Sequence, residues 1–442
     1  MLNIGFIFPS SEYLFDPFRG DPHTHFQILT VLESHFGNKI NPLLVDLRGI
    51  KREFATYHIP ECDAYLYSVY TLDYNELVCI VRSLRERYPK AKHIAGGPHA
   101  AVFKEDTSKI FDALVIGDGE RSIIKAIDDM LDLKLKKVYI QEKPVDINLY
   151  PYPSRRYLPS STVARKGLVA VKNKSEIEEL FSATVIFSRG CPYGCYFCAM
   201  PAIRQYSPGV RYRLPEFIEA EIEYLKRDYG IRAISLLDEI GIPPNLKQAI
   251  PHLDAIGRTG VKWKAQCRVD GITPQIAKPA KEAGCVTMCF GVESVSQRSL
   301  DIINKKIDLR QTREAIAAFK QNGVEVRLYM IIGLPGEPED IVEQTWRFIQ
   351  ETSPDLVYLC LFTARPGTEV FNNPKKFGIK RIDTDWAKTM HMFGRYEHET
   401  PTLTFEYEER TPWGKGFSSE RIINNYTELQ TKLRESGLSI VK

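Results

Sequence analysis

The sequence predicts an α/β protein made of two successive parallel sheets and a C-terminal extension. Short apolar runs alternate with segments that repeat apolar residues every three to four positions, which is typical of strands alternating with helices. This alternation occurs before residue 140 and again after residue 183. Repeated strand–helix units fold as parallel sheets covered by helices. A chain of 442 residues has room for two or three such domains.

The first half predicts a doubly wound, Rossmann-like sheet. Its apolar runs, taken as strands, are 2–8, 42–47, 64–68, 93–95 and 113–116. Helical spacing lies between them, for example over 26–36 and 77–88, and a last helix is predicted over 123–133. Sheets of this kind bind ligands where loops leave the carboxyl ends of the strands.

Four such loops are rich in glycine, serine or threonine. Glycine in such a loop lets the backbone approach a ligand closely. Each loop taken alone is equally compatible with an ordinary tight turn of a flavodoxin-like domain. The candidate ligand-binding residues are Ser10, Ser11, Glu12, Ser68, Tyr70, Thr71, Gly96, Gly97, His99, Gly117, Gly119 and Glu120.

Composition shifts divide the chain. We predict a first domain over 1–140, a linker over 141–182, a second domain over 183–370 and an extension over 371–442. The linker contains a segment at 150–153 that its prolines hold extended, followed by a charged stretch over 172–179, so we expect it to run over the surface.

Three cysteines follow the first apolar run of the second half. Cys191, Cys195 and Cys198 have C-x3-C-x2-C spacing, and the glycines and proline between them force a loop. A 4Fe-4S cluster ordinarily takes four thiolates, so three leave one iron with an open position. A zinc site or a set of buried thiols is the alternative. Zinc sites close with four ligands, and the second cysteine pair that they usually carry is missing.

This motif resembles the cluster motif of the radical S-adenosylmethionine (SAM) enzymes, including the aromatic Phe197 before its last cysteine. In that family the open iron chelates the amino and carboxylate groups of SAM. The reduced cluster then cleaves SAM to methionine and a 5′-deoxyadenosyl radical. The resemblance implies a 4Fe-4S cluster and SAM as cofactors, and an external one-electron reductant of the ferredoxin or flavodoxin type.

The second half also resembles the partial (β/α)6 barrel of that family. Its predicted strands are 184–187, 233–237, 263–268, 286–292, 324–332 and 356–362. Barrels of parallel strands carry their chemistry at the carboxyl ends of the strands. By resemblance, the acidic pair ending the second strand binds the SAM ammonium, the fourth strand end binds the ribose and the fifth binds adenine. An arginine ending the third strand would pair with the SAM carboxylate.

These assignments have ordinary alternatives, since an acidic strand end is also a solvated helix cap and an arginine also forms surface salt bridges. The predicted SAM-binding residues are Phe197, Asp238, Glu239, Arg268, Glu293, Ser294, Arg327 and Gly333. No side chain is assigned to the catalytic step itself.

The four loops of the first half, followed by the cysteine motif, resemble the cobalamin-binding domain that precedes the radical SAM domain in one subgroup. Gly-Gly-x-His and Gly-x-Gly-Glu turns recur there, as at Gly96 and Gly117 here. The resemblance implies cobalamin as a third cofactor. The Asp-x-His-x-x-Gly string of mutase-type domains is missing, so we expect no histidine on cobalt, and His23 and His25 are expected to be polar loop residues.

The combined resemblance implies a C-methyltransferase that moves a methyl group from methylcobalamin to an unactivated carbon. By family analogy the acceptor is a peptide or protein, such as methyl-coenzyme M reductase at glutamine or arginine, or else a small molecule. A cobalamin-binding radical SAM cyclase is the alternative enzyme. An iron–sulfur electron carrier without a SAM pocket is the alternative outside this class.

Bulk properties exclude several other classes. The net charge is +3, with 59 basic and 56 acidic residues, which favours neither nucleic acid nor a membrane surface as a partner. No apolar run approaches the length of a membrane span, so we expect a cytoplasmic protein that needs low oxygen. The cysteines outside the motif are expected to be buried thiols: Cys62, Cys79, Cys267, Cys285, Cys289 and Cys360. The extension predicts a last helix over 419–436, and either packs as that helix or caps the barrel.

Overall fold

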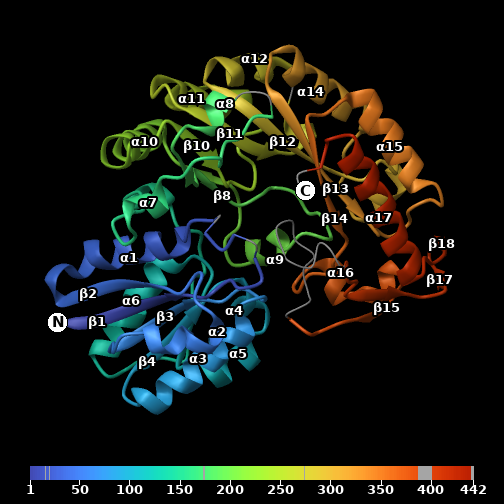
Figure 1. Ribbon diagram of the computed structural model, residues 1–442. Helices are drawn as coiled ribbons and strands as arrows, with labels where there is room; N and C mark the ends of the chain where they lie inside the picture. The colour runs from blue at the N-terminus through green and yellow to red at the C-terminus, as the bar shows by residue number, and fades with distance from the viewer. Residues whose placement is uncertain (15, 19, 173–174, 273, 387–400, 440–442) are drawn as a thin grey trace. The chain divides into compact units, whose positions relative to one another are not determined.

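The computed structural model describes all residues except 15, 19, 173–174, 273, 387–400 and 440–442 (Figure 1). Its described residues form two compact units. Unit 1 contains residues 1–162, 199–209 and 384–386, and unit 2 contains 163–198, 210–383 and 401–439. The division at 162 differs from the predicted limits at 140 and 182, because the second half of the predicted linker packs into unit 2.

Unit 1 contains the doubly wound sheet that the sequence predicts. Its strands are β1 (Leu2–Phe8), β2 (Ile40–Asp46), β3 (Ala64–Ser68), β4 (Lys92–Gly96), β5 (Ala113–Ile116) and β6 (Val138–Ile140). All are parallel, in the order β2-β1-β3-β4-β5-β6. The sequence did not indicate β6, which has only three residues.

Helices cover both faces of this sheet (Figure 1). Helices α1 (His23–Phe36) and α6 (Gly119–Leu131) pack their apolar sides on one face. Helices α3 (Tyr74–Arg87), α4 (Pro98–Val102) and α5 (Lys104–Ile110) lie against the other. Helices α1 and α3 begin three residues before the predicted starts, since their first turns carry polar and aromatic residues outside the apolar repeat.

Unit 2 contains the predicted six-stranded partial barrel. Its strands are β7 (Ser182–Val185), β10 (Ala233–Leu236), β11 (Lys262–Cys267), β12 (Cys285–Glu293), β13 (Glu325–Ile332) and β14 (Leu356–Leu361). They are parallel and neighbours in chain order. An arc of helices lies outside them (Figure 1): α10 (Pro215–Tyr229), α11 (Leu246–Arg258), α12 (Pro274–Glu282), α14 (Leu309–Gln321) and α15 (Ile341–Thr352).

The predicted linker over 141–182 is not a surface crossing throughout. Val169, Val171 and Ile177 are buried against Ala233 and Val286, so the stretch before β7 contributes a small core to unit 2. The short helices α7 (Ser160–Val163) and α8 (Ser175–Glu178) flank this core. The expectation of a surface path is therefore wrong for this part, because its valines and isoleucine cover the barrel.

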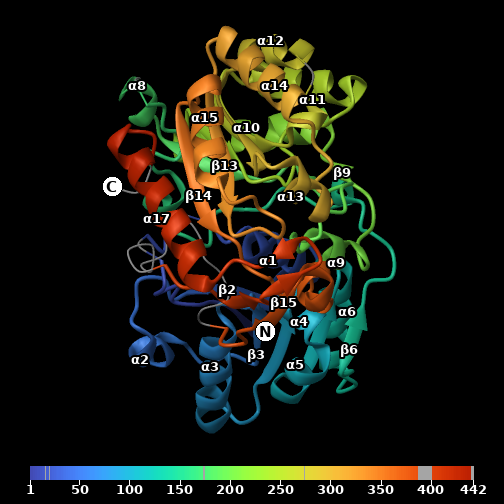
Figure 2. The ribbon, with the colours of Figure 1, turned by 90° about the vertical axis from the view of Figure 1, so that its right-hand side faces the viewer.

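The extension adds one long helix and two small strand pairs. Helix α17 (Ser419–Glu435) confirms the predicted last helix and lies beside β14 (Figure 2). The Val357 N–H donates to the Leu438 carbonyl at 2.8 Å, so the chain end protects the β14 edge. The pairs are β15 (Ile379–Ile382) with β16 (Phe405–Tyr407), and β17 (Arg410–Thr411) with β18 (Gly414–Lys415).

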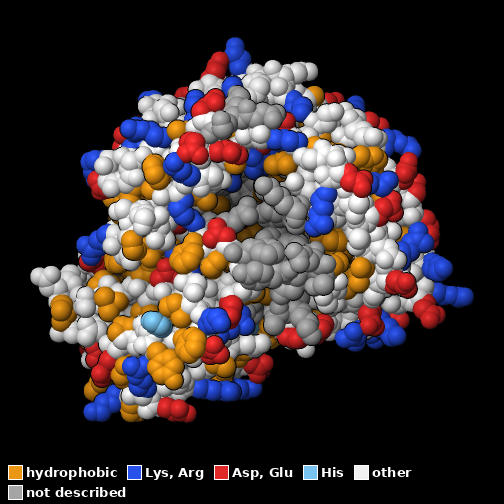
Figure 3. Space-filling model, in the orientation of Figure 1, with side chains coloured by type: hydrophobic (Ala, Val, Ile, Leu, Met, Phe, Trp, Pro, Cys, Tyr) orange, Lys and Arg blue, Asp and Glu red, His pale blue; other side chains and the backbone are white. Residues whose placement is uncertain are grey.

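The smaller elements complete the fold. Unit 1 also contains α2 (Arg52–Ala55) and α9 (Met200–Arg204). Unit 2 also contains the pair β8 (Ser188–Arg189) and β9 (Arg211–Tyr212), with α13 (Gln297–Ile302) and α16 (Glu369–Asn372). Acidic and basic side chains are interspersed on the face drawn in Figure 3. Within the described ranges, no helix combines the length and apolarity needed to cross a membrane.

Candidate cofactor sites

The three predicted cluster cysteines lie in one loop of unit 2, after β7. All are free thiols; Cys195 is buried, and Cys191 and Cys198 are half-buried. Burial raises the pKa of Cys191 and Cys195, and repulsion among the three sulfurs adds to it. The positive charges of Lys305 and Arg268 lower the pKa of Cys195. Buried sulfurs beside two cations suit an anionic thiolate cluster.

A second loop, after α13, holds the cysteine loop in place. The Asn304 side chain donates to the Gly194 carbonyl at 2.7 Å, and the Tyr196 N–H donates to the Ile303 carbonyl at 2.9 Å. Both contacts fix backbone between the cysteines. The chain therefore orders the loop through its own hydrogen bonds, which fits a pre-shaped cradle for a cluster. No three metal-ligand side chains in the described part of the chain are placed to hold a single metal ion.

Arg268 lies directly against this cradle. Its Nη1 donates to Cys195 Sγ at 3.0 Å, and its guanidinium carbon lies 3.8 Å from the centre of the Tyr193 ring. Its Nε and Nη2 hold Asp270, each at 2.9 Å, and Nη2 also donates to the Lys305 carbonyl. Arg268 already binds the Asp270 carboxylate and the Cys195 thiol. The SAM carboxylate would therefore have to compete with these groups for the predicted pairing.

The two acidic residues after β10 differ in their surroundings. Asp238 is buried and accepts the Phe187 N–H at 3.1 Å, with Ser188 as a further donor. Burial raises its pKa to about 7. Asp238 thus ties the end of β10 to the chain leaving β7. Glu239 is exposed, and its carboxylate accepts the backbone N–H groups of Gly190 and of Glu239 itself. It is the member of the pair that solvent, and therefore a ligand, can reach.

Glu293 ends β12 in a conformation unusual for a residue with a side chain, at φ +67°. Its carboxylate binds the Lys305 ammonium at 2.7 Å, and both groups are nearly buried. The Lys305 ammonium also lies 5.8 Å from the centre of the Phe197 ring. Ser294 is buried and accepts the Ser296 N–H. The structure thus brings the predicted ribose site and the cluster loop together through a lysine that the sequence did not indicate.

Arg327 does not lie with the other predicted SAM residues. It is the third residue of β13 and pairs with Leu356, the first residue of β14, so it lies near the amino end of the barrel. It binds Glu325 at 2.6 Å and the Tyr358 hydroxyl at 3.1 Å. Gly333 follows six residues later, about 20 Å further along an extended strand. The surroundings of Arg327 support a role in closing the amino end.

The turn after β13 is covered by the extension. Gly333 has φ +94°, and a Cβ there would lie 2.8 Å from Ile422 of α17, so only glycine fits. Its N–H donates to the Glu337 carboxylate at 3.0 Å, and its carbonyl accepts the Tyr407 hydroxyl at 2.8 Å. Burial raises the pKa of Glu337 to about 8. Glu337 and Tyr407 therefore shape the predicted adenine site. Glu337 ends the stretch 331–337 that resembles the family's adenine-binding segment, whereas no motif indicated Tyr407.

The candidate loops of unit 1 lie at the carboxyl ends of its strands. In the loop after β1, the Ser10 N–H and hydroxyl donate to the Glu76 carboxylate at 2.7 and 2.8 Å. Ser11 has φ +51°, and Glu12 donates its N–H to Ser10 Oγ. Arg52 binds Glu76 at 3.0 Å, so the loop is held by a buried carboxylate.

The loops after β3 and β4 pack on one another. A Cβ on Gly97, which has φ +92°, would lie 2.8 Å from the Val69 nitrogen. His99 is buried, stacks on Tyr74 at 4.2 Å and shares a hydrogen bond of 3.2 Å with Thr71. Burial lowers its pKa to about 4, so it is neutral. The other predicted ligand-binding residues of these two loops are Ser68, which is buried, Gly96, and Tyr70, which is half exposed.

The loop after β5 opens helix α6. Asp118 precedes Gly119, the first residue of this helix, and its carboxylate accepts the Val145 N–H at 2.9 Å. Gly117 has a positive φ and faces Gln141 and Tyr206. Glu120, next in the helix, is buried. All four predicted loops thus flank one end of the sheet, as its strand directions require.

Two predictions about single residues are wrong. His23 and His25 are not loop residues, because α1 begins at His23 and both rings are buried. Burial lowers the pKa of both, and His25 shares a hydrogen bond of 3.0 Å with the Ile7 carbonyl. Cys79 is exposed rather than buried, since it lies on the outer side of α3. Cys360 is half-buried, and the remaining four cysteines outside the motif are buried as expected.

Comparisons with known proteins agree with this organisation. Residues 185–349 match the family model of the radical SAM superfamily, which confirms the predicted radical SAM domain. An uncharacterized methyltransferase of Pyrococcus horikoshii is 30% identical over 287 residues, which cover 63% of this chain and 62% of that protein. The chain thus spans about three fifths of the length of this relative.

Solved structures extend the likeness to both units. The radical SAM methyltransferase TsrM from Kitasatospora setae, with cobalamin and a [4Fe-4S] cluster bound, superposes with a TM-score of 0.64 at 14% identity, over 83% of this chain and 76% of that one. The cobalamin-dependent radical SAM enzyme OxsB, with aqua-cobalamin bound, superposes with a TM-score of 0.63 at 16% identity. The match covers 99% of this chain and 62% of that one. At these identities the likeness concerns the fold, and it confirms the predicted fold class.

Proposed function

We propose that this chain, whose barrel is a radical SAM domain, is a cobalamin-dependent C-methyltransferase of the cytoplasm that acts on an unactivated carbon. The observation that carries the proposal is the loop after β7, where three cysteines lie beside Arg268 and Lys305. The matched family model, the methyltransferase relative and the fold shared with TsrM and OxsB support it. The acceptor is a peptide, a protein or a small molecule.

The residues present fit the three cofactors. Cys191, Cys195 and Cys198 would hold a 4Fe-4S cluster, and the loops of unit 1 around Gly97 and Gly117 would hold cobalamin. When bound, the cluster with SAM supplies a carbon-centred radical after reduction by an external one-electron donor, and cobalamin supplies the methyl group. The chain's own residues bind and orient these groups, and exclude water from them.

Within unit 2, each polar side chain has a defined part. Exposed Glu239 would accept the SAM ammonium, and Glu293 would accept ribose hydroxyls, with Lys305 balancing its charge. Arg268 would keep the Cys195 sulfur as a thiolate by donating to it at 3.0 Å. The Gly333 turn would shape the adenine site indirectly, because its N–H and carbonyl are held by Glu337 and Tyr407. Asp238 would act indirectly, by fixing the backbone from which the cysteine loop leaves β7.

The test is anaerobic reconstitution with iron, sulfide and hydroxocobalamin, followed by SAM and a reductant. We expect iron–sulfur absorbance, 5′-deoxyadenosine, and corrin that survives desalting. Cys195→Ala should abolish the first two and leave the corrin. The matched control is Cys79→Ala, which removes an exposed thiol outside the loop and should change none of the three.

Each negative result has a separate meaning. Loss of corrin on desalting would leave a radical SAM enzyme without the proposed methyl carrier. A zinc ion in place of iron, or a cluster that does not respond to SAM, would overturn the proposal as a whole.

A further inference from the structure

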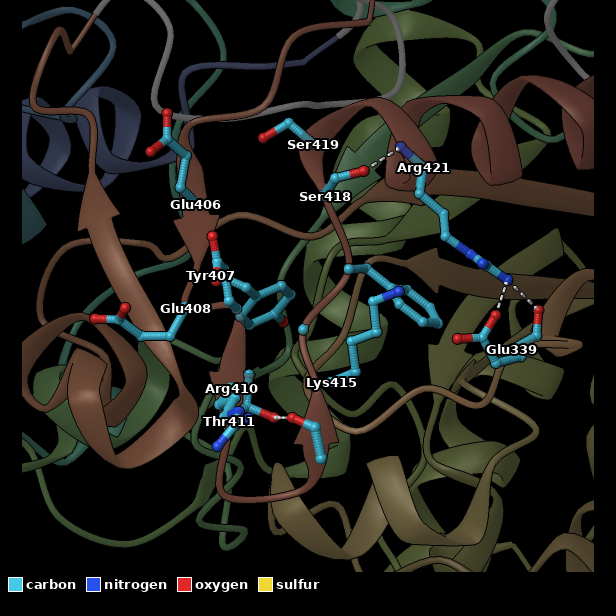
Figure 4. A pocket seen from close by; sticks show the side chains of 14 residues that line it. Glu339, Glu406, Tyr407, Glu408, Arg410, Thr411, Lys415, Ser418, Ser419 and Arg421 are labelled. Atoms are coloured by element: carbon cyan, nitrogen blue, oxygen red, sulfur yellow. Dashed lines mark hydrogen bonds and ion pairs between the residues drawn. The ribbon is translucent and has the colours of Figure 1, made fainter.

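Unit 2 contains a second concave site, built by the extension. It is a groove of about 1080 Å³ between strand β16, the β17–β18 hairpin and the first turn of α17, with Glu339 at its far wall. Figure 4 shows Glu406 and Tyr407 on one side, Arg421 bound to Glu339 on the other, and Lys415 between them. None of the predicted cofactor residues lines it.

One wall of the groove is a strand whose second edge pairs with no other strand among the residues that the structure describes. Strand β16 belongs to a sheet of two strands and pairs on one side with β15. Three successive lining residues, Glu406 to Glu408, come from β16 and the position after it. An unpaired strand edge presents backbone N–H and C=O groups that another extended chain can pair with. This feature favours a polypeptide as the occupant over a compact small molecule.

The charges of the groove are divided between paired and available groups. Arg421 binds Glu339 at 2.6 Å and Arg381 binds Glu406 at 2.7 Å, so these ions neutralise each other at the rim. Lys415 is exposed, and it makes no ion pair among the residues that the structure describes. The first turn of α17, capped by Ser418, adds positive potential on the same side. Glu408, Glu409 and Arg410 also line the groove, and Glu408 points away from Lys415 (Figure 4). The exposed ammonium of Lys415 is therefore the place in the groove where an acidic side chain would bind.

The size and polarity of the groove also fit a peptide. Sites for small molecules are typically about 300–1,000 Å³ and lined mainly by apolar groups. This groove is slightly larger than that range, and its lining is largely charged and hydroxylated.

The groove is connected to the turn that ends β13. Tyr407 lines the groove, and its hydroxyl donates to the Gly333 carbonyl at 2.8 Å. An occupant packed on Tyr407 thus lies one hydrogen bond from the predicted adenine site.

We propose that this groove binds an extended segment of the protein acceptor by adding it as a strand to β16, with an acidic side chain of the segment on Lys415. This proposal rests on the proposed methyl transfer and names its substrate class: a protein recognised through a stretch of extended backbone. Small-molecule acceptors would leave the groove unused.

The experiment is a charge exchange measured by fluorescence anisotropy on the full chain. The probes are short fluorescein-labelled threonine and serine peptides with either glutamate or lysine at the centre. The unmodified protein should prefer the glutamate peptide by about tenfold, the effect of one charge-assisted contact. Lys415→Glu should reverse the preference. Lys247→Glu, which reverses an exposed lysine at the start of α11, should leave it unchanged.

A third peptide tests strand addition. It is the glutamate peptide with alternate backbone nitrogens methylated, which removes the hydrogen-bond donors along one edge. It should bind about tenfold more weakly than the unmethylated glutamate peptide. Equal binding of all peptides, no binding up to the millimolar range, or an unchanged preference in Lys415→Glu would overturn the proposal. A concentration-dependent dimer that Lys415→Glu abolishes would also overturn it, by assigning the groove to a second copy of the chain.

Production of 5′-deoxyadenosine by the same samples separates this proposal from the proposed function. Lys415→Glu should retain it, which also shows that the variant is folded. If the unmodified protein binds the peptides as expected but never cleaves SAM, the docking groove stands and the methyltransferase proposal fails. If SAM is cleaved but the protein binds all peptides equally, the docking proposal fails and the proposed function stands.

Discussion

The carboxyl ends of the two parallel sheets carry different chemistry. In unit 2 the loops hold charges that are paired with each other, such as Glu293 with Lys305 and Arg268 with Asp270. In unit 1 the loops after β3 and β4 instead hold Gly97, which has a positive φ, and the neutral, buried ring of His99. Paired charges can exchange partners with a charged ligand, whereas neutral surfaces select a large ligand by shape. The difference supports a zwitterionic sulfonium in unit 2 and a corrin in unit 1.

The largest effect should follow from breaking the buried pair of unit 2. Lys305→Met leaves the Glu293 carboxylate buried without its cation, which typically costs about 3–5 kcal/mol of unfolding free energy. Glu293→Gln keeps the shape and removes the charge that would accept ribose hydroxyls. We expect Glu293→Gln to raise the dissociation constant for SAM by about 10- to 100-fold, measured by equilibrium dialysis on the reconstituted protein.

The amino end of the same barrel provides the matched control. Glu325 and Arg327 form a buried pair of similar geometry, at 2.6 Å. Glu325→Gln should destabilise unit 2 but change the dissociation constant for SAM by less than about twofold, since the site is built at the other end. If it weakens SAM binding as much as Glu293→Gln does, the contrast between the two barrel ends fails, and the prediction that Arg327 binds SAM is restored.

The next effect should come from the neutral surface of unit 1. Gly97→Ala puts a Cβ within 3 Å of the Val69 backbone at a φ of +92°, which should cost about 2 kcal/mol or more. We expect the loops after β3 and β4 to separate and the corrin to wash out on desalting, while the iron content of unit 2 stays unchanged. The control is Gly20→Ala in the same unit, where a Cβ meets nothing within 4 Å. Corrin retained by Gly97→Ala would show that these loops do not form its site.

The sequence predicts where strands and candidate site residues lie better than it predicts which side chains contact one another. Strands β3 and β5 were predicted with their observed bounds, because aromatic and β-branched runs end there at turn residues. The candidate SAM-binding residues were chosen from the family resemblance and from the rule that barrels carry chemistry at strand ends, and they stay a prediction. Lys305 was missed because its contact with Glu293 depends on how the loop after α13 folds back. Nothing local in a sequence records such a contact.

Arg327 is the opposite case, a residue that the sequence selected but that lies away from the predicted site. Its residue type suited the family pattern, but its register in β13 places it at the amino end of the barrel. The buried role of Asp238 was also invisible, because its partners are backbone N–H groups on a neighbouring strand end. Residue type and order along the chain therefore indicate candidates, and the ladder register decides which of them meet.

The two units should respond oppositely to pH. In unit 1, burial lowers the pKa of His23, His25, His93 and His99. The unfolded chain therefore binds more protons than the folded unit below about pH 6.5, and stability is lost as the pH falls towards 4. In unit 2, burial raises the pKa of Asp238 to about 7 and of Glu337 to about 8. Here the folded state binds more protons, and stability is lost as the pH rises from about 4 to 8.

Among the residues that the structure describes, two buried groups oppose these trends, as do the solvent-accessible Asp228 and Glu406 of unit 2, whose pKa values are lowered by Arg227 and Arg381. Burial raises the pKa of Asp73 in unit 1 to about 7 and lowers that of His252 in unit 2 to about 4. In each unit, the difference in bound protons between the folded and unfolded states keeps the sign given above. Each proton of that difference changes the free energy of unfolding by about 1.4 kcal/mol per pH unit. Hydrogen exchange at pH 5 and pH 7.5, corrected for intrinsic rates, should show β1–β5 less protected at pH 5 and β10–β13 less protected at pH 7.5. Parallel changes in both sheets would contradict the contrast.

The smallest effect should come from the hydrogen bond that joins the extension to the site. Tyr407→Phe removes the donor to the Gly333 carbonyl and keeps the ring packed on Phe405, so it should cost about 1 kcal/mol and weaken SAM binding by about fivefold or less. The matched variant Tyr426→Phe removes the hydroxyl of a second buried tyrosine, which lies on α17 near Cys360. If Tyr407→Phe alone weakens SAM binding, the backbone of the Gly333 turn is set by the extension. If both variants weaken it equally, the extension acts only by stabilising the barrel, and the turn is shaped by Glu337 from within.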